Sequence, residues 1–113
     1  MHEMSIAENI IGIVVKESAR AGSDTVAELE LEIGLLAGVE YDALEFALKV
    51  IAPGSIIDSS KLVIHKPGGK AVCNECGFEF KTSQPVNCCD SCSSYDCAII
   101  QGKELRIKSI LIE

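Results

Sequence analysis

The chain of 113 residues is 48% hydrophobic and 24% charged, a composition that fits one small folded unit and excludes a disordered or fibrous protein. Its 10 basic and 17 acidic side chains give a formal net charge of −7. A surface of this sign repels nucleic acid unless a basic patch overrides it, and the sequence contains no such patch. We therefore expect no nucleic-acid partner; a cation or a protein suits this charge better.

The first residues and the apolar segments predict a cytoplasmic chain. The longest apolar run near the start, residues 10–15, is far shorter than the ~20 residues that cross a membrane. A secretory signal is not expected, because His2, Glu3 and Glu8 stand where a cationic segment would be needed. We expect no membrane partner.

The first third of the chain predicts a helix followed by a strand. Ser5 and Glu8 have the spacing of a capping box, so the helix is expected to begin at about Ser5. It should end near Ala21, because Gly22 favours a left-handed stop. Residues 26–33 then alternate between apolar side chains and glutamates, which is typical of a strand with one wet face.

The remaining regular elements are a second helix and two strands. Asp42 is expected to cap the helix, and the Pro-Gly pair at 53–54 should end it. Residues 61–66 are predicted to form a strand, and Pro-Gly-Gly at 67–69 predicts a break before the cysteines. A last strand over 104–113 should return to the first sheet.

This order of elements predicts an α+β fold. The simplest solution is two helices packed on one face of a three-stranded sheet, with an inserted four-cysteine, zinc-ribbon-like module. We expect one domain to comprise residues 1–69 plus 98–113 and the module to comprise 70–97. The break at 67–69 would permit module swapping between chains, so a monomer or a weak homodimer is expected.

The six cysteines predict a local metal site. All lie between Cys73 and Cys97, and thiols stay reduced in the cytosol, so a disulfide framework is not expected. Four of them form two C-x-x-C pairs separated by twelve residues, a spacing that lets two tight turns surround one tetrahedral ion. The predicted zinc ligands are Cys73, Cys76, Cys89 and Cys92.

Other roles for these cysteines stay open. Four thiolates also suit a rubredoxin-type iron, and buried or redox-active cysteines are the alternatives to any metal. Cys88 and Cys97 are left over. Because neighbouring side chains diverge in extended backbone, Cys88 and Cys89 should not bind the same ion, and we interpret Cys88 and Cys97 as spare thiols.

The amino terminus is a second candidate metal site. His2 places an imidazole beside the α-amine of Met1 and the intervening amide nitrogen, a set that suits divalent nickel or copper. With the helix capped at Ser5, the backbone N–H groups of His2 and Glu3 donate no hydrogen bond within the helix. The alternative is a frayed, solvated terminus. His65 is interpreted as a packed or surface residue.

Several segments together resemble a known family. Residues 1–5 (Met-His-Glu-Met-Ser), the two C-x-x-C pairs and residues 102–110 (Gly-Lys-Glu-Leu-Arg-Ile-Lys-Ser-Ile) resemble the hydrogenase nickel-insertion accessory family, HypA/HybF. The turn at 35–38 and the helical segment 43–47 extend the likeness to essentially the whole chain. The initial Met-His-Glu is its most specific element, because it combines a ligand type with an absolute position.

The resemblance implies a nickel metallochaperone. Nickel would be bound by His2, with backbone nitrogens and Glu3, in the domain formed by 1–69 plus 98–113, and the four paired cysteines would hold zinc. With a partner GTPase, such proteins deliver nickel to the large subunit of nickel-iron hydrogenase, and in some organisms they support urease maturation. The chain departs from the family at Asp90, where many members have proline, and in its extra thiols, which leave Cys88 and Cys89 as competing candidates for one position.

Two other classes of function are the alternatives. A zinc-ribbon module for interaction or nucleic-acid binding would need a basic and aromatic surface, of which the sequence offers little. An enzyme would need a nucleophile with a histidine partner, a carboxylate pair or a phosphate-binding glycine loop, and we find none of these patterns. We therefore expect a protein without catalytic activity.

Overall fold

The structure, a computed structural model, describes residues 2–113. It contains two compact units. Unit 1 comprises Met1–Leu31, Val39–Ile64 and Arg106–Glu113, and unit 2 comprises Glu32–Gly38 and His65–Leu105. Within residues 2–113, neither helix has the length and apolar character that crossing a bilayer requires.

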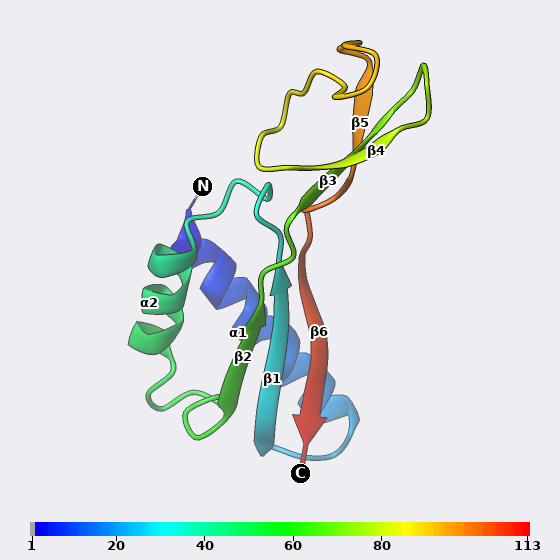
Figure 1. Cartoon of the computed structure of the whole chain (residues 1–113). Helices are drawn as coiled ribbons and strands as arrows, with labels where there is room; N and C mark the ends of the chain where they lie inside the picture. Colours follow the sequence, from blue (N-terminus) through cyan, green and yellow to red (C-terminus); the bar gives the residue numbers. More distant parts are fainter. Residues whose placement is uncertain (1) are drawn as a thin grey trace. The chain divides into compact units, whose positions relative to one another are not determined.

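Unit 1 is built around a three-stranded sheet in the order β2-β1-β6. Figure 1 shows β1 and β2 running in the same direction and β6 running opposite to them. Parallel neighbours need a crossover connection, and α2 provides it. The elements are α1 (Glu3–Arg20), β1 (Val26–Ile33), α2 (Tyr41–Ile51), β2 (Lys61–His65) and β6 (Leu105–Ile112).

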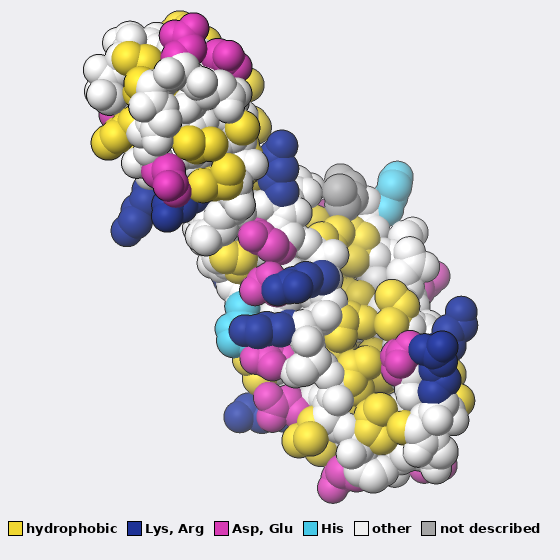
Figure 2. Space-filling model, turned by 90° about the vertical axis from the view of Figure 1, so that its right-hand side faces the viewer, with side chains coloured by type: hydrophobic (Ala, Val, Ile, Leu, Met, Phe, Trp, Pro, Cys, Tyr) yellow, Lys and Arg dark blue, Asp and Glu magenta, His cyan; other side chains and the backbone are white. Residues whose placement is uncertain are grey.

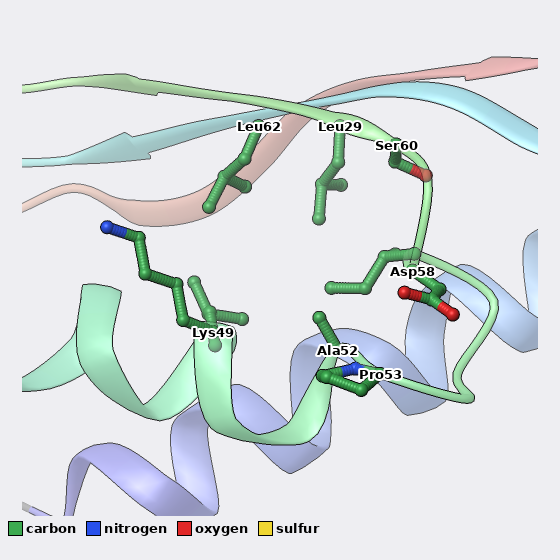
Figure 3. A pocket seen from close by; sticks show the side chains of 9 residues that line it. Leu29, Lys49, Ala52, Pro53, Asp58, Ser60 and Leu62 are labelled. Carbon is green, nitrogen blue, oxygen red and sulfur yellow. The ribbon is translucent and has the colours of Figure 1, made fainter.

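Both helices cover one face of this sheet, as the sequence predicts (Figures 1 and 3). The alternation in β1 explains the layering, because Leu29 and Leu31 are buried whereas Glu28 and Glu30 are only half-buried. The predicted α+β class is thereby confirmed. The buried apolar side chains of unit 1 are Ala7, Ile10, Val14, Val26, Leu29, Leu31, Leu44, Ala47, Leu48 and Ile57.

The predicted starts of both helices are wrong. Helix α1 begins at Glu3 with His2 as its N-cap, so the capping box at Ser5 does not form. Helix α2 has Glu40 as its N-cap, and Asp42 lies in its first turn. Neither cap makes a side-chain hydrogen bond, and an acidic residue in each first turn complements the helix dipole instead.

Unit 2 contains a second three-stranded sheet, which is antiparallel and has the order β4-β3-β5. Its strands are β3 (Gly69–Cys73), β4 (Glu79–Thr82) and β5 (Cys97–Gln101). Strand β3 begins inside the predicted break at 67–69. Ala71 and Cys73 of β3 form a small core with Phe80 of β4 and with Cys89. Whether residues 70–97 form a separate domain stays a prediction.

Charges of both signs are distributed over the molecule. On the face shown in Figure 2, acidic and basic side chains lie interspersed with apolar ones. Arg20 pairs with Glu17 at 3.1 Å and Lys70 with Glu79 at 3.5 Å, and all four side chains are well exposed. Such surface pairs contribute little to stability.

Backbone packing in unit 2 requires glycine at position 34. The Leu36 N–H donates to the Gly102 carbonyl at 2.6 Å, and the Gly34 N–H donates to the Glu104 carbonyl at 2.7 Å. A Cβ atom on Gly34 would lie 2.0 Å from the Gly102 oxygen. Because that oxygen belongs to backbone, the strain cannot be relieved by rotating a side chain.

We expect Gly34→Ala to lower the free energy of unfolding by about 2 kcal/mol or more, through this overpacking. Gly12→Ala is the matched control, since nothing lies within 4 Å of a Cβ there and the site is an exposed helical position. It should raise stability by about 0.5–1 kcal/mol. Chemical denaturation measures both, and equal effects of the two substitutions would contradict the close approach.

Candidate metal sites

Four cysteine sulfurs of unit 2 form one compact cluster. The Sγ atoms of Cys73, Cys76, Cys89 and Cys92 all lie within 4.8 Å of one another. The Cys73–Cys92 and Cys76–Cys89 sulfur pairs are each 3.6 Å apart. A tetrahedral ion with metal–sulfur bonds of ~2.3 Å separates its ligands by about 3.8 Å. The donor set therefore fits a single Zn²⁺, and its spacing also suits iron.

The first cysteine pair forms a tight turn at the end of β3. The Gly77 N–H donates to the Cys73 carbonyl at 2.9 Å, and the Cys73 N–H donates to the Phe78 carbonyl at 2.9 Å. The Cys76 N–H points at the Cys73 sulfur, 3.4 Å away. Gly77 closes the turn with φ of 78°, a conformation that glycine adopts without steric cost.

The second pair repeats this turn. The Ser93 N–H donates to the Cys89 carbonyl at 2.9 Å, and the Cys89 N–H donates to the Ser94 carbonyl at 2.8 Å. The N–H groups of Ser91 and Cys92 point at the Cys89 sulfur from 3.4 and 3.5 Å. Ser93 takes the place of the glycine and has φ of 63°, which is unfavourable for a residue with a Cβ atom.

Burial and hydrogen bonding make the four sulfurs unequal. Cys73 and Cys89 are buried, whereas Cys76 and Cys92 are exposed. The Cys76 N–H favours the Cys73 thiolate and lowers the pKa of Cys73 to about 6. The Ser94 N–H favours the Cys92 thiolate, but the Cys73 sulfur and desolvation outweigh it and raise the pKa of Cys92 to about 12. A cation is needed to hold all four as thiolates together.

Asn74 and Asp96 connect the first turn to the segment before β5. The Asn74 N–H donates to the Asp96 carbonyl at 2.8 Å, and its side-chain amide donates to the Asp96 carboxylate at 3.0 Å. The Asp96 N–H in turn donates to the Ser94 hydroxyl at 3.1 Å. Sequence reasoning missed this contact, because no local pattern marks two residues that lie 22 positions apart.

The two remaining thiols lie outside the sulfur cluster. The Cys88 sulfur donates to the Ser93 carbonyl at 3.2 Å, and the Cys97 sulfur donates to the Ser94 carbonyl at 3.6 Å. Burial raises the pKa of Cys97. Of the adjacent pair, the geometry brings Cys89 and not Cys88 to the other three sulfurs.

The structure describes the amino terminus from His2 onward, so the predicted role of the Met1 α-amine lies outside the described residues. His2 is exposed and its side chain makes no capping hydrogen bond. The first helical hydrogen bond runs from the Ile6 N–H to the His2 carbonyl at 3.2 Å. The amides of His2 and Glu3 thus precede the first helical donor, as expected, although the helix starts earlier than predicted.

The side chain of Glu3 is engaged within unit 1. Its carboxylate accepts a hydrogen bond from the Glu40 N–H at 3.4 Å. The backbone of Glu40, an exposed residue 37 positions away, thereby contacts the start of α1. The sequence gives no signal for this contact. His65 lies half-buried on β2, and within residues 2–113 the one group of three or more clustered metal-binding side chains is the cysteine set.

Comparison with known proteins identifies the family. A family model described as "Hydrogenase/urease nickel incorporation, metallochaperone, hypA" matches residues 1–112. The chain belongs to the HypA family. A relative from Parabacteroides distasonis named "Hydrogenase maturation factor HypA" is 42% identical over 113 residues, which cover 100% of this chain and 98% of the relative. Proteins of the same name from Chlorobium limicola and Crocosphaera subtropica are 38% and 39% identical, covering 97% and 96% of those proteins.

Solved structures of HypA proteins share the fold. The solution structure of the Ni metallochaperone HypA from Helicobacter pylori aligns with a TM-score of 0.68 at 22% identity, covering 99% of this chain and 97% of that one. A second structure, titled "Solution structure of HypA protein", gives a TM-score of 0.73 at 21% identity, covering 100% and 97%. At these identities the likeness concerns the fold alone.

The sulfur cluster predicts different outcomes for two adjacent cysteines. Cys89→Ser should weaken zinc binding by more than about a hundredfold, because one of four thiolates is lost. Cys88→Ser is the matched control and should change the affinity by less than about threefold, since its sulfur lies outside the cluster and donates to backbone carbonyls. Competition with a chromophoric chelator measures both affinities. Loss of binding in the Cys88 variant alone would reverse the assignment.

The strained turn residue gives a second prediction. Ser93→Gly should raise the free energy of unfolding of the metal-bound protein by about 0.5–1 kcal/mol, because glycine removes the cost of the left-handed backbone. Ser91→Gly, in the same turn but without a positive φ, should lower stability slightly. Thermal unfolding at saturating metal separates the two, and a Ser93 variant that is no more stable than the Ser91 variant would refute the strain.

Proposed function

We propose that this protein is a nickel metallochaperone of hydrogenase maturation, which carries nickel at its amino terminus and holds a structural zinc ion in unit 2. The observation that carries the proposal is the position of His2: an exposed imidazole stands at the N-cap of α1, next to backbone amides without helical acceptors. Membership of the HypA family over nearly the whole chain supports the same conclusion.

The chemistry of the amino terminus suits nickel. An imidazole and deprotonated amide nitrogens form the nitrogen-rich, tetragonal set that divalent nickel favours. In the proposed site His2 supplies its ring nitrogen and Glu3 its backbone nitrogen. The hydrogen bond from Glu40 holds the Glu3 carboxylate, which favours the amide of Glu3 as the ligand. An exposed site of this kind can pass its ion to a partner.

The cysteine cluster suits a structural role. Zinc bound by Cys73, Cys76, Cys89 and Cys92 has no open coordination position, so it neither activates water nor exchanges readily. In the proposed role the ion joins the end of β3 to the turn at 89–93. Its charge offsets the repulsion among four thiolates, and the N–H groups that point at Cys73 and Cys89 stabilise the same charge.

The proposed partners follow from the family. Relatives are named hydrogenase maturation factors, and the family description includes urease. We infer that the protein works in the cytoplasm with a nickel-handling GTPase and delivers nickel to the large subunit of nickel-iron hydrogenase, and that urease is a further recipient in organisms that have one. We assign no catalytic step to the chain itself.

The test is nickel binding by an untagged chain that begins at Met1. His2→Ala should abolish nickel binding in calorimetry while leaving zinc content and the circular dichroism spectrum unchanged. His65→Ala is the matched control, because it removes the other histidine from β2 and should leave nickel affinity within about twofold. Undiminished nickel affinity in the His2 variant, or its loss in the His65 variant, would overturn the proposal.

A further inference from the structure

An apolar pocket opens in unit 1 between the carboxyl-terminal half of α2 and the strands β1 and β2 (Figure 3). Its volume is about 280 Å³. Leu29 and Leu62 point into it from the sheet, and Ala52 faces them from the end of α2 (Figure 3). The apolar side chains that line it are Leu29, Leu48, Ala52, Pro53, Ile57 and Leu62.

The size of the pocket suits one inserted side chain. Sites for drug-sized ligands usually occupy about 300–1,000 Å³, and this pocket lies at the lower limit of that range. Large apolar side chains that fill such pockets are the residues that dominate binding in protein interfaces. A protein segment is therefore the better-matched occupant.

The pocket lies beside the outer strand of the sheet in unit 1. Strand β2 is the outer strand of the order β2-β1-β6, so one of its edges has no neighbouring strand within the described residues of unit 1. Because strand side chains alternate between faces, Leu62 faces the pocket while Lys61 lies on the opposite face of the sheet. An extended segment added along this edge would direct every second side chain toward the pocket.

The charges at the rim select the chemistry of that segment. Lys49 and Asp58 stand at opposite ends of the pocket (Figure 3). The Asp58 carboxylate accepts a hydrogen bond from the Gly54 N–H at 3.1 Å and so belongs to the loop after α2. Lys49 is exposed and, among residues 2–113, has no ion pair. An anionic side chain would complement it.

The outer surface of α2 carries two further apolar side chains. Phe46 and Val50 are 68% and 51% exposed, and Phe46 lies one helical turn before Lys49. Exposed apolar side chains of this size are typical of protein-binding surfaces.

We propose that the β2 edge and this pocket bind an extended segment of a partner protein. One large apolar side chain of the segment fills the pocket, and an acidic side chain beside it pairs with Lys49. Main-chain hydrogen bonds to β2 supply the orientation. The binding needs no nickel, so this site and the proposed nickel site stand or fall separately.

The test begins with a phage-displayed library of random heptapeptides, selected on the full-length, zinc-loaded protein. The expected consensus is a large apolar residue within two positions of Asp or Glu. Selection on Lys49→Glu should replace the acidic residue of the consensus by a basic one. Lys16→Glu, the same charge reversal on α1, is the matched control and should leave the consensus unchanged.

The synthesised consensus peptide is then titrated into the protein by calorimetry and by amide NMR. Lys49→Glu and the pocket-filling Ala52→Leu should each weaken binding at least tenfold, with circular dichroism and zinc content unchanged. Shifts should concentrate in residues 61–65 and at the end of α2. The proposal would be overturned if the selection enriches no peptide or gives a consensus without acidic residues. It would also be overturned if the amide chemical-shift changes lie elsewhere, or if a second copy of the chain already occupies the β2 edge.

Discussion

Unit 2 depends on a cluster of four sulfurs within 4.8 Å of one another, two buried and two exposed, because as thiolates they would repel each other without a cation. The N–H groups around them reduce that repulsion. Backbone N–H groups point at Cys73 and Cys89, and each turn is closed by a left-handed residue, Gly77 or Ser93. A complete sulfur set binds its ion tightly and leaves no free coordination position, so the proposed exchangeable ion must lie elsewhere.

The amino terminus offers the opposite properties. His2 is exposed and its neighbouring amides precede the first helical hydrogen bond, so donors are available without breaking any bond of α1. The link from Glu3 to Glu40 joins the starts of the two helices within unit 1. The apolar pocket lies at the other end of α2. A partner segment bound there would contact the same helix whose N-cap holds Glu3.

The features that the sequence predicts well are those encoded by short-range periodicity or spacing. The alternation over 26–33 identifies β1, and the two C-x-x-C pairs identify the four sulfurs that come together. The predicted start of α1 is wrong because Ser5 and Glu8 match a capping box by spacing alone. The helix begins earlier, with Glu3 in its first turn. Capping motifs indicate a helix start only when the backbone turns there.

Contacts between distant residues could not be predicted. Asn74 with Asp96 and Glu3 with Glu40 depend on how the chain returns on itself. The strands of unit 2 were missed for a related reason, since β3 and β4 are short and lie among turns and cysteines that carry no alternating pattern. The close approach of the Gly34 and Gly102 backbones likewise follows from tertiary packing. The sequence shows a glycine at position 34 but not the backbone that it contacts.

The most direct measurement is X-ray absorption at both metal edges on one sample of the untagged chain, loaded with one equivalent each of nickel and zinc. We expect only nitrogen and oxygen neighbours around nickel, and four sulfurs at ~2.3 Å around zinc. Sulfur neighbours around nickel, or fewer than four around zinc, would contradict the separation of a transferable ion at His2 from a structural ion among the cysteines.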